Sequence, residues 1–192
     1  ANLASQSRGD PAETVWLWSS DDFGRFHPLG TTAGGEDLAT HLVHGARVSL
    51  SVGIAAMLGA GLLALAFALV SAYYRGVADL LLVLVGDTVQ SIPLLLLLLL
   101  VLAVFRGTPV YEFYDALPLL SGVLALAQWP FLWRAVRAPA LQVGEADWVD
   151  AARAFGQRPR RTMRRHMAPH VVGYLFVYAS LSLGGVILAV AA

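Results

Sequence analysis

Long apolar stretches alternate with polar ones along most of this chain, and four of the apolar stretches have the length of a membrane span. Residues 48–72 carry no charge, and residues 80–105 carry a single acid, Asp87. As helices, both are long enough to cross the ~30 Å hydrocarbon core of a bilayer. Residues 117–133 are at the lower limit of that length, and residues 171–192 form a further uncharged stretch. The pattern therefore predicts four transmembrane helices, at about 48–72, 80–105, 117–133 and 171–192.

Composition supports an integral membrane protein. The 192 residues are 57% hydrophobic and 14% charged, and their mean hydropathy is +0.65. Soluble globular domains are about 25% charged, so this chain does not have the composition of one. The predicted fold class is an all-α membrane protein, a polytopic helical bundle. The absence of cysteine excludes disulfides, thiolate catalysis and cysteine metal sites.

The charges divide the chain into an external and a cytoplasmic side. Residues 134–170 hold eight arginines against three acids, whereas residues 1–47 hold three arginines against six acids. Arginine-rich loops stay in the cytoplasm under the positive-inside rule. We therefore expect an external segment with an amphipathic lead-in helix over 1–47 and a transmembrane core over 48–192. Within that core, residues 134–170 form a cytoplasmic loop and residues 106–116 a short external one.

The cytoplasmic loop contains a segment with a helical period of its own, residues 145–169, which we call the hairpin. Gly156 is placed to end one helix, and Pro159 is placed to begin a second one, which Pro169 closes. Positions at offsets 0, 3, 4, 7, 10 and 11 share one face of the first helix: Glu145, Trp148, Val149, Ala152, Phe155 and Gly156. The second helix carries five arginines within eight positions, which require an aqueous, electronegative neighbourhood.

The hairpin resembles the "EAA" loop of ABC-importer permeases, which is that family's docking site for its ATPase. The match runs Asp150-Ala151-Ala152, three residues, Gly156, nine residues, and then His166-Met167-Ala168-Pro169. It departs from the family where Asp150 replaces Glu, Ala168 replaces Leu and His170 replaces Asn. A loop that only orients the protein is the less specific alternative, because orientation requires arginines but not this spacing.

A second stretch, residues 27–50, resembles the segment that leads into a core span of the dipeptide/oligopeptide/nickel branch, in the second, C-type permease of the pair. It begins with HPLG and ends with GAR-x-SL. Thr32 stands where that branch has Asp, and Glu36 stands where it has Arg. The charge reversal at Glu36 means that a salt bridge made there by the family is not expected here.

The resemblance implies a type I ABC-importer permease fold, of which this chain is expected to be a fragment with four of six transmembrane helices. It implies a transport subunit rather than an enzyme, with peptides or related solutes such as nickel complexes as cargo. The implied partners are a second homologous permease, two ATP-binding cassette subunits and an external substrate-binding protein, in the bacterial inner membrane and without nucleic acid. ATP and Mg would be bound by the ATPase, and no cofactor or metal by this chain.

By the same resemblance, the hairpin inserts into a cleft of the ATPase, so that closure of the ATPase dimer moves the spans. Such docking would bury an apolar face among charges that fix its orientation. The residues expected to form this coupling loop are Glu145, Trp148, Val149, Asp150, Ala151, Ala152, Phe155, Gly156, Arg161, Arg165, His166 and Pro169.

A few polar positions in or near the spans are candidates for function. Asp87 and Gln90 lie in the first half of a span, where polar groups are costly and often functional. We favour a structural role for Asp87, solvated near the cytoplasmic edge or paired within the bundle, over contact with a substrate. Pro93 is expected to bend the same span. His41 and His44 share a helix face, but no third ligand is nearby, so a solvated face is favoured over a metal site.

Two other functional classes remain open. A passive channel or structural membrane protein would use the basic loop to bind anionic lipids. A membrane-embedded enzyme has less support, because the spans offer one acid and no histidine or Ser-Lys constellation. Co-purification of an ATP-hydrolysing subunit would separate the transporter from the first alternative.

Overall fold

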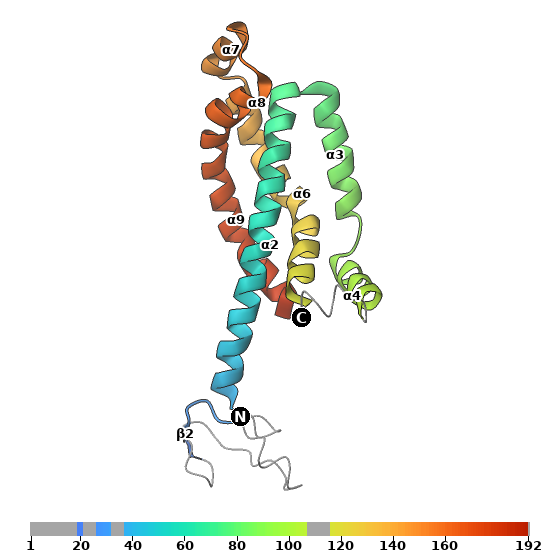
Figure 1. Cartoon of the computed structure of the whole chain (residues 1–192), viewed down its shortest axis with the longest axis vertical. Helices are drawn as coiled ribbons and strands as arrows, with labels where there is room; N and C mark the ends of the chain where they lie inside the picture. Colours follow the sequence, from blue (N-terminus) through green and yellow to red (C-terminus); the bar gives the residue numbers. More distant parts are fainter. Residues whose placement is uncertain (1–18, 21–25, 32–36, 107–115, 192) are drawn as a thin grey trace. The chain divides into compact units, whose positions relative to one another are not determined.

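The computed structural model describes residues 19–20, 26–31, 37–106 and 116–191. Its long helices are α2 (Leu38–Tyr74), α3 (Gly76–Gln90), α4 (Leu94–Phe105), α6 (Ala116–Gly144) and α9 (Ala168–Ala191). Shorter helices lie between α6 and α9, namely α7 (Asp147–Ala154), α8 (Pro159–Thr162) and the π-helix η1 (Met163–Met167), as Figure 1 shows. Two short strands, β1 (Ser19–Ser20) and β2 (Phe26–His27), pair antiparallel with Ser19 opposite His27.

Among the described residues, three helical stretches are long and apolar enough to cross a membrane: Leu38–Tyr74, Leu117–Gly144 and Pro159–Leu188. A fourth candidate consists of α3 and α4 together, with a bend of 72° between them. Pro93 immediately precedes α4, and a proline has no N–H with which to continue a helix. The helical membrane-protein class is therefore confirmed, and the bend lies where Pro93 predicted it.

Two helices extend beyond the predicted spans. α2 joins the predicted lead-in helix to residues 48–72 without interruption, and α6 continues from the third span to Gly144. The first part of the predicted loop 134–170 is therefore helical. Alanine, leucine and arginine all favour helix, so a helix continues past the apolar stretch until a residue stops it. Most of the predicted external segment, and residues 107–115 of the predicted external loop 106–116, lie outside the described residues.

Pro169 does not end the second helix of the hairpin, and this part of the prediction is wrong. Pro169 lies in the first turn of α9, and helix continues through Pro159–Leu188. In η1, the N–H of Ala168 donates to the carbonyl of Met163, five residues back instead of four. This wider turn accommodates the proline ring, which would otherwise clash with a carbonyl of the preceding turn. The basic half of the hairpin is therefore continuous with the fourth span.

Small side chains form the buried face of α2. Five alanines recur there at every fourth position and are fully buried: Ala56, Ala60, Ala64, Ala68 and Ala72. A repeat of four keeps side chains on one face of a helix. At Gly59, between two of them, an added Cβ would lie 2.9 Å from the Cβ of Ala125 in α6. Small residues thus allow the α2 and α6 backbones to approach closely, as in many transmembrane helix pairs.

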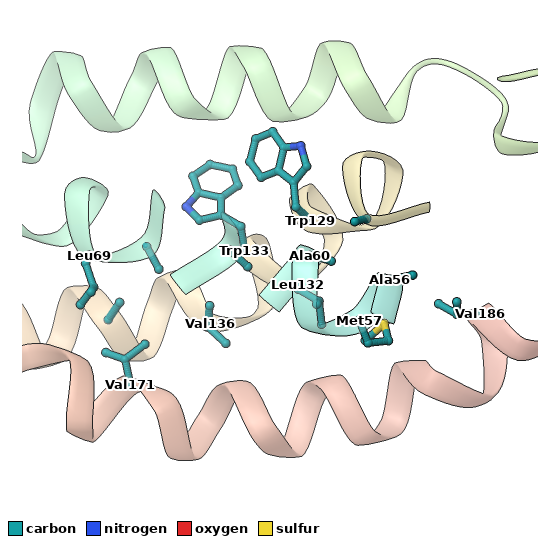
Figure 2. Packing of buried hydrophobic residues seen from close by; sticks show 14 of the residues in the cluster. Ala56, Met57, Ala60, Leu69, Trp129, Leu132, Trp133, Val136, Val171 and Val186 are labelled. Carbon is teal, nitrogen blue, oxygen red and sulfur yellow. The ribbon is translucent and has the colours of Figure 1, made fainter. Parts of the chain in front are cut away.

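Large side chains fill the space between α6 and α3. Trp129 and Trp133 extend from α6 toward α3, and both are almost completely buried (Figure 2). The ring centroid of Trp129 lies 4.6 Å from that of Phe67 in α2. Gly86 in α3 faces Trp133, and an added Cβ there would lie 3.1 Å from the indole ring. The contact of Gly86 with Trp133 packs α3 closely against α6.

The chain divides into two units, residues 1–50 and residues 51–192. In the first unit, Asp37 caps the start of α2, because Thr40 donates to Asp37 Oδ2 both its hydroxyl hydrogen at 2.6 Å and its N–H at 3.3 Å. The Thr40 hydroxyl lowers the pKa of Asp37 below its usual range. His27 Nδ1 lies 3.3 Å from Asp37 Oδ1, so two residues of the HPLG-containing stretch meet at the start of α2.

Candidate functional site

The turn of the hairpin is closed by backbone hydrogen bonds that require glycine at one position. The N–H of Gly156 donates to the carbonyl of Arg153 at 2.9 Å, and the N–H of Gln157 donates to the carbonyl of Ala152 at 3.1 Å. This pair of bonds is a Schellman motif, in which the glycine adopts a left-handed conformation. Gly156 has φ +69°, and Pro159 is the first residue of α8. The predicted helix, turn and second helix are therefore present.

The predicted docking face of the hairpin is divided between the core and the surface. Val149 is fully buried, whereas Phe155 is 90% exposed and Trp148 is 52% exposed. Ala152 is half-buried and Glu145 is exposed. Val149 therefore holds α7 against this chain, whereas the exposed parts of Trp148 and Phe155 are available to a partner. Two further predicted residues of α7 are exposed on its surface, Asp150 and Ala151.

The second half of the hairpin presents a basic surface. Thr162 and Met167 are fully buried and His166 is half-buried, so they anchor the helix. The Thr162 hydroxyl donates to Gln157 Oε1 at 3.0 Å, which ties the turn to α8. Five side chains here are exposed and form no ion pair within the part of the chain that the structure describes: Arg158, Arg160, Arg161, Arg164 and Arg165. This half of the hairpin therefore offers five guanidinium groups to its surroundings.

The arginines of α6 are bound by acids of α3. The guanidinium of Arg137 donates to both carboxylate oxygens of Asp79, from Nε to Oδ1 at 2.7 Å and from Nη2 to Oδ2. The Ser71 hydroxyl of α2 also donates to Asp79 Oδ1, so three helices meet at one carboxylate. Sequence reasoning missed this group. Its signal was that Asp79 and Arg137 both lie just outside predicted spans, at the same predicted membrane boundary.

Asp87 has a partner within the described chain. It pairs with Arg134 of α6, and about half of each side chain remains exposed. Pairing within the bundle is one of the two structural alternatives expected for this residue, whereas its effect on transport remains a prediction. Gln90 is the exposed last residue of α3.

Metal binding is not suggested by the arrangement of potential ligands. His41 and His44 are exposed on α2. Among the residues with a described position, no three histidine or acidic side chains gather where they could hold a metal ion.

Comparisons with known proteins identify the family of this chain. Residues 60–192 match the family described as binding-protein-dependent transport system inner membrane component. The chain is similar to the oligopeptide transport system permease protein OppC of Haemophilus influenzae, with 31% identity over 163 residues, covering 85% of this chain and 50% of the relative.

Two further relatives have related names. The dipeptide transport system permease protein DppC of Alkalihalophilus pseudofirmus is 30% identical over 169 residues, covering 86% of this chain and 52% of the relative. The OppC protein of Escherichia coli is 28% identical over 188 residues, covering 98% of this chain and 60% of the relative. The chain thus spans about half the length of the curated relatives it matches. Because the family match covers more than half of its residues, the chain belongs to the binding-protein-dependent transport system inner membrane component family.

Proposed function

We propose that this chain is part of the transmembrane permease subunit of an ATP-driven ABC importer that moves peptides, or related solutes such as nickel complexes, across the bacterial inner membrane. The names of its relatives, which are oligopeptide and dipeptide transport system permeases, support the cargo class. In this proposal, the chain works with a second homologous permease, two ATP-binding cassette subunits and an external substrate-binding protein. ATP and Mg bind to the cassette subunits, so this chain binds cargo and transmits movement.

The observation that carries the proposal is the exposed aromatic side chain at the turn of the hairpin. Phe155 is 90% exposed, yet it lies in the most highly charged part of the chain rather than on a lipid-facing span. The hydrogen bonds that close the turn at Gly156 hold its backbone in one conformation. A rigidly held aromatic surrounded by charges is typical of the anchor residues at protein interfaces.

Electrostatics supports the same role. The exposed arginines of the second helix lie next to Phe155 in sequence and have no acidic partner within the described chain. Charges around an apolar contact speed association and fix the orientation of the partner. Together with Trp148, Phe155 therefore provides the apolar contact, and the arginines provide the orienting rim for an acidic cleft on the ATPase.

The test is to purify the native permease, tagged on this subunit, from its own membranes and to label co-purifying proteins with a photoreactive azido-ATP. We expect a labelled band of ATP-binding cassette subunits to accompany the unmodified protein. Phe155→Ala should reduce it about tenfold or more, since truncating an interface anchor costs roughly 2 kcal/mol. The matched control is Phe176→Ala, which truncates a 68% exposed phenylalanine in α9.

Absence of a labelled subunit from the unmodified protein would contradict the transporter assignment. Equal labelling of Phe155→Ala and Phe176→Ala would remove the hairpin from the docking site.

A further inference from the structure

We call residues 141–153, from the end of α6 through most of α7, the base of the hairpin. The turn between α2 and α3 contacts this base through several independent interactions. Arg75 lies in this turn, and its Nη1 is 3.0 Å from Oε1 of Glu145, just before α7. Its Nη2 also lies 3.5 Å from the carbonyl oxygen of Leu141, in α6. At Gly144, an added Cβ would lie 2.8 Å from the carbonyl oxygen of Ala72. The ends of α2 and α6 are therefore in backbone contact here.

The backbone of Arg75 indicates that this turn is tightly constrained. Arg75 has φ +53°, and it is the one non-glycine residue with a positive φ in the described part of the chain. Such a conformation is costly for a residue with a side chain and persists where surrounding contacts determine it. The contacts of its guanidinium with Glu145 and Leu141 are of that kind.

Arg153 joins α7 to the last turn of α2, directly before the turn that contains Arg75. Its Nη2 donates to the carbonyl oxygen of Tyr73 at 3.1 Å, and its guanidinium carbon lies 4.6 Å from the centre of the Tyr73 ring. Its Nη1 lies 3.2 Å from Oδ1 of Asp150, in the preceding turn of α7. One planar guanidinium thus contacts a carbonyl, an aromatic face and a carboxylate. A lysine ammonium lacks the planar fork that makes this combination possible.

These contacts matter because α2 and α3 are not directly connected to the hairpin along the chain. The hairpin is covalently continuous with α6 on one side and with α9 on the other. α2 and α3, in contrast, meet the base of the hairpin only through noncovalent contacts, such as those of Arg75 and Arg153. Two packed elements move together when the contacts between them are held by rigid elements and hydrogen bonds.

We propose that Arg153 and Arg75 are positioning residues that lock the base of the hairpin to the α2–α3 turn. A displacement of the hairpin by its partner is then delivered to α2 and α3 as well as to α6 and α9. This inference rests on the proposed function, because it assumes that an ATPase displaces the hairpin. It goes beyond docking, since it concerns contacts between residues of this chain.

The test compares ATP-driven peptide uptake with ATP hydrolysis in the reconstituted native transporter. Arg153→Lys and Tyr73→Leu should leave the ATPase bound but lower the uptake per ATP about fivefold or more, the lower end of a typical coupling between sites. Tyr73→Phe is the matched control, because the contacts of Arg153 use the ring and the backbone carbonyl of Tyr73. It should behave like the unmodified protein.

A charge exchange tests the second contact. Arg75→Glu and Glu145→Arg should each lower the uptake per ATP, and the double variant should recover much of it because the opposite charges are restored. Arg75→Glu alone keeps a side chain at the same positive φ, so backbone strain is matched between the single and double variants.

The outcomes separate this inference from the function on which it rests. Loss of the ATPase from the unmodified transporter would contradict the proposed function. An ATPase that stays bound to Arg153→Lys and Tyr73→Leu with unchanged uptake per ATP would overturn the positioning role. A lower yield of folded protein with an unchanged uptake per ATP would also overturn it, since that result would mean that the contact only stabilises the fold. A double charge exchange no better than either single variant would remove Arg75 and Glu145 from the lock.

Discussion

The arginines around the hairpin fall into two groups that differ in what surrounds them. Arg75, Arg134, Arg137 and Arg153 each contact a carboxylate of this chain. Those of the second group, at 158–165, are exposed and without an ion pair in the described residues. Apart from Arg75, the arginines of both groups belong to the basic loop 134–170 that is predicted to be cytoplasmic. One basic region of the sequence therefore contains two kinds of arginine, one that holds helices together and one that is exposed to a partner.

The distribution of acids along the chain explains this division. Three acids precede or lie between the arginines of the first group in the sequence: Asp79, Asp87 and Glu145. These acids lie on helices or turns that pack beside those arginines. After Asp150 the sequence contains no aspartate or glutamate. The arginines of α8 and η1 therefore have no acid on their own helix, and any acidic partner would have to come from elsewhere.

Substitutions in the two groups of arginines should differ most in their effect on the free energy of unfolding. Arg137→Met leaves Asp79 mostly buried without its partner, which should cost about 1–3 kcal/mol, less than for a fully buried pair because part of Arg137 is exposed. Arg160→Met is the matched control in the exposed group and should change stability little. The measurement is thermal unfolding of the purified protein in detergent. Equal melting temperatures for the two variants would contradict the division.

The exposed arginines should instead affect association with the ATPase. Arg164→Gln together with Arg165→Gln should leave the melting temperature unchanged and weaken ATPase binding severalfold, with a weaker dependence on salt, as expected for charges at an interface rim. Titration of the ATPase into permease-containing nanodiscs at two salt concentrations measures this. An unchanged affinity and salt dependence would show that these arginines serve another partner, such as anionic lipid.

A smaller effect is expected for Asp87→Asn. Its pair with Arg134 is about half exposed, and exposed ion pairs contribute about 1 kcal/mol or less. The variant should give a lower yield of folded protein, while the protein that folds still transports. Yield in the membrane fraction and uptake per folded molecule are the two measurements. A normal yield with abolished uptake would assign Asp87 to the transport pathway instead.

The smallest effect should come from the cap of α2, which belongs to the first unit of the chain, whereas both groups belong to the second. Asp37→Ala removes the acceptor of the Thr40 hydroxyl and N–H. Amide hydrogen exchange should become faster in the first turn of α2 and stay unchanged in α7. Because the pKa of Asp37 is lowered in the folded chain, its stabilising contribution is present near neutral pH and is lost as the pH falls through that lowered value. Identical exchange in the variant would contradict the cap.

Features set by local chemistry were predictable from the sequence, and those set by packing between helices were not. Gly156 and Pro159 could be placed because a left-handed residue and the first helical residue have strong local preferences. The prediction that Pro169 ends a helix was wrong because no local sequence pattern predicts the π-turn that accommodates this proline. The burial of Val149 depends on how α7 meets the rest of the chain. The contact of Arg137 with Asp79 depends on the register of two helices far apart in sequence.

Docking of the ATPase through the hairpin is tested most directly by placing aspartate at two glycines of similar backbone conformation. Gly156 and Gly76 have φ +69° and +51°, both are exposed, and at neither would an added Cβ meet an atom of this chain within 4 Å. The strain from a side chain at positive φ, roughly 1 kcal/mol or more, is therefore similar at the two sites. Only Gly156 lies in the turn of the hairpin.

The measurement is retention of the ATPase on washed membranes that contain equal amounts of each variant. We expect Gly156→Asp to release the ATPase and abolish uptake, and Gly76→Asp to retain the ATPase. Retention of the ATPase and full uptake by Gly156→Asp would contradict docking through the hairpin, and with it most of the case for an ATP-driven permease.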